Sequence, residues 1–104
     1  MRAVFLASYG PAAMRGLIAG SNRPKAIDDM LATVGGKLVS VMFARGEFDA
    51  VVTVELPDRN AVVAGTMAVL ASGSLTRLSV LEEVDMATVL PMAAKAAAAY
   101  KPAG

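Results

Sequence analysis

The order of the apolar segments predicts an α+β fold built on one four-stranded antiparallel sheet. Four runs of strand length, at 3–7, 37–43, 48–56 and 75–84, are rich in β-branched or large apolar residues. Apolar residues recur at helical spacing between the first and second runs, and again between the third and fourth. A short segment containing Gly46 joins the second and third runs as a hairpin. This βαββαβ order is that of the ferredoxin-like fold.

Rules of handedness and adjacency specify the layout of such a sheet. We expect the strand order fourth, first, third, second, with both helical connections on one face and an extra helix at the C-terminus. The length of 104 residues suits one domain, 1–104, because a chain of this size has room for one hydrophobic core.

The first strand and the connection after it have clear local signals. Run 3–7 is apolar on both sides, as in a central strand covered on both faces. The connection predicts a helix broken near Gly20, whose second part has Pro24 in its first turn and stops at Gly35-Gly36.

The hairpin and the helix after it also carry local signals. Gly46 is expected at positive φ, where a tight reversal strains other residues. Pro57 cannot donate a ladder hydrogen bond and ends the third strand, and Asp58 is placed to cap the next helix. The large apolar residues of that helix are expected to face the core: Val62, Val63, Met67 and Leu70.

The last segment, from Asp85, is rich in alanine and predicts the extra helix. Pro91 either kinks that helix or restarts it, because proline removes a helical hydrogen bond. The tail from Lys101 is expected to fray.

Alternation along the strands sorts their side chains between a helix-covered face and an open face. On the covered face we place Phe48, Ala50, Val52, Val54 and Leu56 of the third strand, and Val39, Val41 and Phe43 of the second. On the open face we place Asp49, Val51, Thr53 and Glu55, then Leu38, Ser40 and Met42, and finally Arg77, Ser79 and Leu81 of the fourth strand.

Composition indicates that the protein associates with itself. Hydrophobic residues make up 56% of the chain and charged residues 18%, and a small domain cannot bury that much apolar surface alone. We therefore expect a homodimer through the open sheet faces, and a higher oligomer is open. The ten basic and nine acidic residues give no electrostatic footprint for nucleic acid or an anionic membrane.

The chain contains neither cysteine nor histidine. Disulfides and thiolate nucleophiles are thus excluded, and the commonest metal ligand and the usual base near neutral pH are absent. We expect no cofactor and no metal site. No run approaches the roughly 20 apolar residues of a spanning helix, and the apolar start of the chain breaks at Ser8 to Pro11, so a cytoplasmic protein is expected.

Three segments share a pattern with a known family: Gly-Gly-Lys-Leu at 35–38, Gly-Glu-Phe-Asp at 46–49, and 52–58 with Pro57-Asp58 at its end. They resemble the GYD domain proteins, small bacterial proteins named for a Gly-Tyr-Asp signature, and the likeness extends over most of residues 3–84. The resemblance implies a dimeric α+β barrel, in which two ferredoxin-like sheets pack through their open faces. The motif residues carried over are Gly46, Phe48, Asp49, Pro57 and Asp58. The sequence departs from the pattern because Phe48 replaces the tyrosine and because Asn22-Arg23-Pro24 stands in the helix-breaking turn.

Two carboxylates are candidates for chemistry. Asp49 follows the turn and is a potential base, although an aspartate beside a turn more often binds backbone amides of its own hairpin. Glu55 lies on the open face, where a bare charge is costly once that face is covered. Its structural alternative is a salt bridge to Arg77 or Arg15, or exposure at the strand end.

The preferred function is that of a small soluble protein that binds a small molecule or regulates a partner. The expected cleft lies between the sheets and the first helical connection, lined by Tyr9, Arg15, Met42, Thr53, Glu55 and Arg77. The alternative is a cofactor-independent enzyme, since the resemblance implies a barrel that also serves monooxygenases and isomerases. Without histidine or cysteine, the proton acceptor would be Glu55 or Asp49, aided by Tyr9. The sequence contains no catalytic motif, which favours binding.

Overall fold

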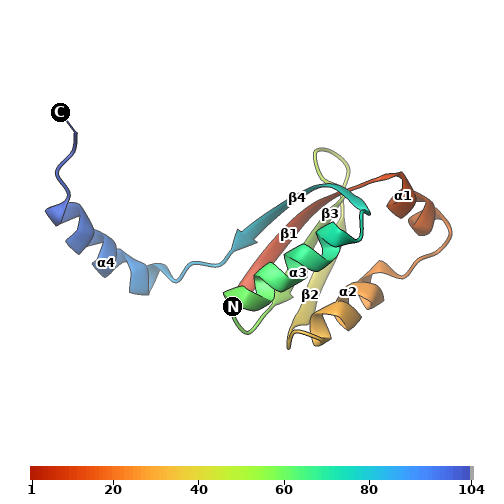
Figure 1. Ribbon diagram of the computed structural model, residues 1–104, viewed down its shortest axis with the longest axis horizontal. Helices are drawn as coiled ribbons and strands as arrows, with labels where there is room; N and C mark the ends of the chain where they lie inside the picture. Colours follow the sequence, from red (N-terminus) through yellow and green to blue (C-terminus); the bar gives the residue numbers. More distant parts are fainter. Residues whose placement is uncertain (104) are drawn as a thin grey trace.

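A computed structural model of the protein describes residues 1–103 and shows an α+β fold (Figure 1). One four-stranded antiparallel sheet carries helices on one face, and a last helix projects from the body. The elements are β1 (Arg2–Tyr9), α1 (Pro11–Ile18), α2 (Arg23–Ala32), β2 (Lys37–Phe43), β3 (Ala50–Glu55), α3 (Arg59–Ala71), β4 (Leu75–Glu82) and α4 (Met86–Ala99).

The strands are ordered β2-β3-β1-β4, which is fourth, first, third, second when read from the other edge. β1 pairs antiparallel with both β3 and β4, so it is a central strand with a neighbour on each side. Because β3 and β4 are parallel to each other, the chain between them must cross back along the sheet, and α3 makes that crossing.

The first connection breaks where the sequence predicts. α1 ends before Gly20, which has φ +95°, and α2 begins after Asn22. The Asn22 side chain accepts a hydrogen bond from the Lys25 amide at 3.1 Å, and Pro24 occupies the first turn. Gly35, at φ +78°, follows the end of α2. Residues that tolerate or require these backbone angles therefore divide the connection into two helices.

The hairpin turn contains Gly46 at φ +146°, which confirms the expected positive angle. β3 begins only at Ala50, because Phe48 and Asp49 belong to the connection. At the far end of β3, the Asp58 side chain accepts a hydrogen bond from the Ala61 amide at 2.9 Å and caps α3 as predicted.

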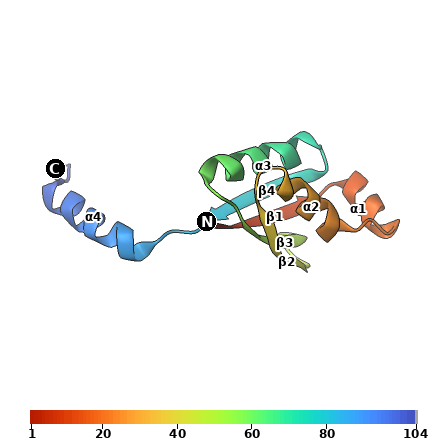
Figure 2. The ribbon, with the colours of Figure 1, turned by 90° about the horizontal axis from the view of Figure 1, so that it is seen from below.

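The core lies between the sheet and the two helices α2 and α3, which share one side of it (Figure 2). It takes alternate residues of the two central strands, as the pleat requires. Its buried members are Ala3 and Phe5 of β1, Ala50, Val52 and Val54 of β3, Leu31 of α2, Leu56, and Ala61 and Val62 of α3. Among the described residues, no helix covers the opposite face of the sheet, so β1 is covered on one face and not on both as expected.

The predicted inner face of α3 was wrong except for Val62. Val63, Met67 and Leu70 are 49%, 66% and 52% exposed, whereas the buried residues of α3 are Ala61, Val62 and Gly65. The helix is apolar on every side, so hydrophobic periodicity cannot select the inward face. Apart from Val62, the residues that α3 buries are small, and its large residues Val63, Met67 and Leu70 are exposed.

The predicted faces of β2 were also partly wrong, because its pairing with β3 shifts between Leu38 and Ser40. An irregularity of this kind turns the residues before it to the other face. Leu38 therefore lies opposite Val54 and packs on the core, while Val39 is 45% exposed. Phe43 lies opposite buried Ala50 but is itself 52% exposed at the end of this edge strand.

α4 runs without interruption through Pro91, and none of its residues is buried. A short segment after β4 carries it away from the sheet, so the molecule is 57 Å long in its longest dimension (Figure 1). Among residues 1–103, no helix combines the length and apolar character needed to cross a bilayer.

Candidate functional site

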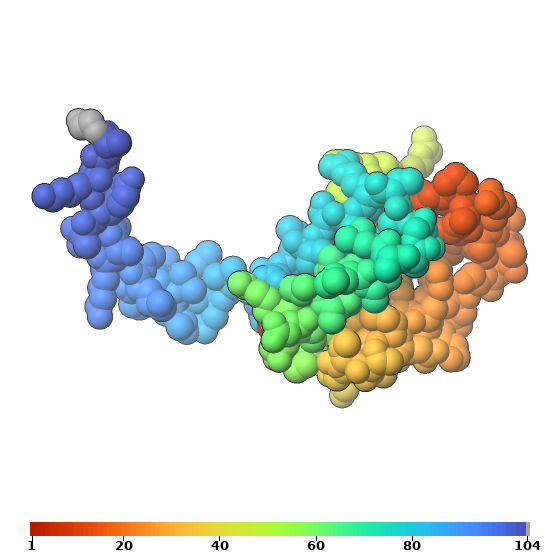
Figure 3. Space-filling model, in the orientation of Figure 1, coloured from red at the N-terminus to blue at the C-terminus, as the bar shows by residue number. Residues whose placement is uncertain are grey.

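A cleft of about 270 Å³ lies between the sheet, α2 and α3. Its floor consists of core-face residues of the sheet, including Phe5, Val52 and Leu78, and its walls include Ile27 of α2 and Val69 of α3. Figure 3 shows this side of the molecule, with α2 and α3 on either side of a hollow. The lining is mostly apolar, which is the usual character of a small-molecule pocket.

The small residues on the inner side of α3 explain why the cleft exists. Gly65 is buried and lines the cleft, yet a Cβ atom added to it would meet nothing within 4 Å. A glycine inside a helix costs about 0.5–1 kcal/mol relative to alanine. Neither the backbone angles nor close packing requires glycine at position 65. Because glycine has no side chain, it leaves space beside Ile27 and Met30 of α2.

Polar groups gather at one end of the cleft, where β1 ends and β4 begins. Tyr9 lies opposite Leu75 in the sheet, and Arg23 is the first residue of α2. The Arg23 Nε atom is buried without a hydrogen-bond partner among residues 1–103. A buried donor without a partner is costly, because it has lost its hydrogen bond to water.

The environment of Tyr9 keeps its hydroxyl protonated. Burial raises the pKa of Tyr9 above 10.0, the positive charge of Arg23 partly opposes this rise, and the negative charge of Asp49 adds to it. At neutral pH, Tyr9 is therefore a neutral group that can donate a hydrogen bond at the polar end of the cleft.

The Asp49 side chain binds a backbone amide near the polar end of the cleft. Its Oδ2 accepts a hydrogen bond from the Tyr9 amide at 2.8 Å, so it binds β1 and not an amide of its own hairpin. The sequence favoured amides of the hairpin as partners of Asp49, because local spacing does not show which strand lies beside it. The carboxylate thus positions Tyr9.

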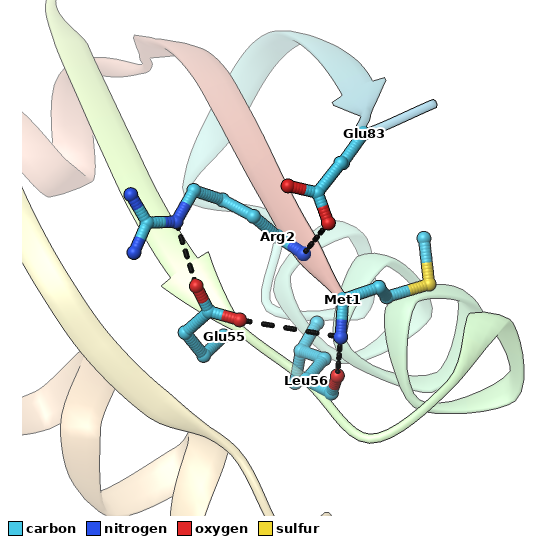
Figure 4. Close-up of polar contacts among 5 residues, drawn as sticks. All are labelled: Met1, Arg2, Glu55, Leu56 and Glu83. Atoms are coloured by element: carbon cyan, nitrogen blue, oxygen red, sulfur yellow. Dashed lines mark hydrogen bonds and ion pairs between the residues drawn. The ribbon is translucent and has the colours of Figure 1, made fainter. Parts of the chain in front are cut away.

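Glu55 lies on the other face of the sheet in a network at the start of β1 (Figure 4). Its Oε1 atom accepts from the Arg2 Nε atom at 2.6 Å, and Oε2 lies 4.0 Å from the N-terminal ammonium group. The ammonium donates to the Leu56 carbonyl at 2.6 Å, and the Arg2 amide donates to Glu83 at 3.3 Å. The Glu55 side chain is 43% exposed, so it is neither unpaired nor enclosed.

The predicted salt-bridge partners of Glu55, Arg77 or Arg15, were wrong, because the sheet register determines which arginine lies opposite it. Arg2 stands directly opposite Glu55, whereas Arg77 stands opposite Ser8 at the other end of β1. Arg77 instead forms an ion pair with Glu47 at 2.5 Å and stacks over the Phe48 ring at 4.9 Å. Phe48 therefore packs beside the hairpin connection. The prediction that it lies on the helix-covered face, in the core, was wrong.

The profile of the GYD domain matches residues 4–92. The chain belongs to the GYD domain family. No curated protein matches it. The match extends past β4 into the first half of α4, farther than the resemblance over residues 3–84 suggested.

This GYD domain does not bring the six proposed site residues together. Tyr9 borders the cleft on the helix side, while Met42, Thr53, Glu55 and Arg77 belong to the open face and Arg15 is exposed on α1. Sequence reasoning missed Arg23 and Gly65. Two signals could have indicated them: a glycine in the middle of an otherwise strong helix, and an arginine at the start of a helix that has no acidic residue in its first turn.

Among residues 1–103, no group of three or more carboxylates gathers in a way that could hold a metal ion. The arrangement in this GYD domain is that of an apolar cleft with hydrogen-bond donors at one end. Its chemistry suits the retention of a ligand with one polar end.

Proposed function

We propose that this GYD domain binds a small, mainly apolar molecule in the cleft between α2 and α3. The observation that carries the proposal is the cleft itself, an apolar space of about 270 Å³ with its polar groups at one end. Ligand pockets have volumes from roughly 300 Å³ upward, so this one suits a small ligand. Apolar cavities favour apolar guests over water, because water finds too few hydrogen-bond partners in them.

Binding has more support than catalysis. The enzyme alternative needs a free proton acceptor in an enclosed site, and Glu55 is paired with Arg2 on the opposite face. Beside the cleft, Asp49 holds the Tyr9 amide, and the pKa of Tyr9 is raised by burial, which makes its phenolate a rare species at neutral pH. These side chains hold neighbouring groups in position. We therefore assign the protein a binding or regulatory role.

A test of the cleft is to fill it from α3. Gly65→Leu adds a large side chain where the backbone leaves open space, and leucine favours helix. Ala64→Leu adds the same side chain at the neighbouring exposed position, which does not line the cleft, and serves as the control. With 1-octanol and octanoate as probes, we expect ¹⁵N NMR titration to show saturable binding at the cleft in the wild type and in Ala64→Leu, and none in Gly65→Leu. Binding that survives in a folded Gly65→Leu variant would place the ligand elsewhere.

For the assembly, we propose the ferredoxin-like fold in its dimeric α+β barrel form. The strand order and the position of α2 and α3 on one face support this arrangement. On the open face, Val4, Leu6 and Val51 are only half-buried, and Met42 and Leu81 are 58% and 56% exposed. A second copy packed on this face would cover these residues and leave the cleft, on the other side, accessible.

Light scattering tests the dimer. We expect a dimer at micromolar concentration, and we expect Val51→Asp to dissociate it, because an unpaired charge in an apolar contact costs several kcal/mol. The exposed Ala64→Asp is the control and should remain dimeric. A monomeric wild type would contradict the proposal. The exposed row of Val63, Met67 and Leu70 on α3 is a second apolar surface that supports a higher oligomer.

A further inference from the structure

We infer that the ligand of the cleft is a small monocarboxylate, whose carboxylate is held by Arg23 at the polar end and whose aliphatic or aromatic body lies between α2 and α3. This inference rests on the proposed function and adds the chemical class of the ligand. Four features of the polar end support it.

The first feature is the Nε donor of the Arg23 guanidinium group. Arg23 lines the cleft, and its Nε atom is buried without a hydrogen-bond partner in the described residues. The salt bridges found among residues 1–103 use the N-terminal ammonium group, Arg2, Lys25, Arg59 and Arg77, and none uses Arg23. A buried N–H donor is retained at a cost unless an acceptor pairs with it. A carboxylate is the simplest partner, because its two oxygens match the forked donors of a guanidinium.

The second feature is that the fold gives Arg23 no other task. The cap of α2 is supplied by Asn22, whose side chain accepts from the Lys25 amide at 3.1 Å, and Pro24 has no amide to satisfy. A positive side chain at the start of a helix is unfavourable to the helix, since it meets the positive end of the helix dipole. The first turn of α2 contains no acidic residue to offset this. The helix start and Arg23 together make the end of the cleft attractive to an anion.

The third feature is the neutral hydroxyl group of Tyr9. Tyr9 is half-buried beside Arg23 and can donate a hydrogen bond to a second carboxylate oxygen. Ser72 does not compete for this role, because its hydroxyl donates to the Val69 carbonyl at 2.6 Å and accepts from the Ser74 amide at 3.2 Å. Asp49 is the negative group near Tyr9, and it is held by the Tyr9 amide at 2.8 Å. Because Asp49 repels an anion, the carboxylate belongs on the Arg23 side of Tyr9.

The fourth feature is the character of the remaining space. Away from Arg23 and Tyr9, the cleft is bordered by apolar side chains such as Ile27, Met30 and Leu78 and by the open position at Gly65. A second charged group on the ligand would meet no counter-charge there. The ligand is therefore a monocarboxylate and not a dicarboxylate, a phosphorylated metabolite or a sugar.

A matched pair of probes tests the inference. Octanoate and 1-octanol have similar apolar bodies and differ in the charge of the head group. By calorimetry at pH 7, we expect the wild type to bind octanoate at least about tenfold more tightly than octanol, as a charge-assisted hydrogen bond would provide. Octanedioate, with a carboxylate at each end, should bind more weakly than octanoate.

Variants of Arg23 supply the second arm. Arg23→Gln should remove the preference for octanoate and leave octanol binding unchanged, while Arg23→Lys should restore part of the preference because it keeps the charge without the fork. Arg15→Gln, at an exposed residue of α1 outside the cleft, removes the same charge and should behave as the wild type.

The outcomes separate the inference from the proposed function. If the wild type binds both probes equally well, the cleft is a ligand site but the carboxylate assignment is wrong. If it binds neither, the proposed function itself fails. If Arg23→Gln loses octanol together with octanoate, Arg23 maintains the shape of the cleft and does not hold an anion, which also overturns the assignment.

Discussion

Helices α3 and α4 begin in the same way and end up in opposite environments. Each is capped by an aspartate that accepts from the amide three residues later, Asp58 from Ala61 at 2.9 Å and Asp85 from Thr88 at 3.4 Å. Their lengths are 13 and 14 residues. Yet α3 buries Ala61, Val62 and Gly65, whereas α4 buries no residue. Capping and propensity thus form a helix, but they do not determine whether it packs.

The difference follows from the position of each helix in the chain. α3 joins two parallel strands, β3 and β4, and must cross the sheet to do so. α4 follows β4, and within residues 1–103 it does not connect two strands of the sheet. Topology therefore supplies the packing surface of a helix, and equivalent changes in α3 and α4 test this.

The largest contrast is expected from a charge placed on each helix. Val62→Asp puts an unpaired carboxylate at a position that is 2% exposed, which should cost roughly 3 kcal/mol or more and unfold much of the population. Val89→Asp, at 39% exposure on α4, should change the free energy of unfolding by no more than about 0.5 kcal/mol. Urea unfolding followed by circular dichroism measures both. Equal losses would mean that α4 is packed in solution.

A smaller contrast is expected from the two caps. Asp58→Ala removes the acceptor for the Ala61 amide in a helix that is part of the core, and should destabilise the protein by about 0.5–2 kcal/mol. Asp85→Ala should leave the midpoint of global unfolding unchanged and reduce only the helical signal of α4, because no core residue depends on that helix. A shift of the midpoint in Asp85→Ala similar to that in Asp58→Ala would show that α4 is coupled to the body.

The mildest contrast concerns pH. Hydrogen bonds from the Thr88 hydroxyl and amide lower the pKa of Asp85 below its usual 3.8. A lowered pKa in the folded helix means that the cap is fully present above pH 3.8 and is lost as the pH falls through the lowered value. We expect the helical signal of α4 to decrease in that window in the wild type. Asp85→Asn, which keeps an acceptor but does not titrate, should show no such decrease. The contribution of α4 to the helical signal is obtained by subtracting the signal of a truncated chain that ends at Glu83.

Much of the fold was predictable because its signals are local. Gly20 and Pro24 divide the first connection, Gly46 takes a positive φ, and Asp58 caps α3, each within a few residues of the feature it controls. The alternation along β3 also held for Ala50, Val52 and Val54, because a regular strand has a fixed side-chain period.

The candidate site was predictable only at Tyr9. The sequence analysis named Tyr9 among the residues lining a cleft beside the first helical connection, and Tyr9 borders the cleft. Arg23 and Gly65 were missed, because the local pattern does not show that α2 and α3 border the same cleft. Met42, Thr53, Glu55 and Arg77 were chosen for the open face, on the opposite side of the sheet from the cleft, and Arg15 of α1 does not line the cleft.

Local sequence signals set most of the breaks between strands and helices, since glycine, proline and capping side chains act on the backbone beside them. Only the tertiary structure decided which residues face each other. The shift in β2 turned Leu38 inward, the register of β1 paired Glu55 with Arg2, and the crossing of α3 turned its small residues to the sheet and left the cleft open. These outcomes depend on contacts between segments far apart in the chain, and such contacts are set by pairing register and packing, which no single segment encodes.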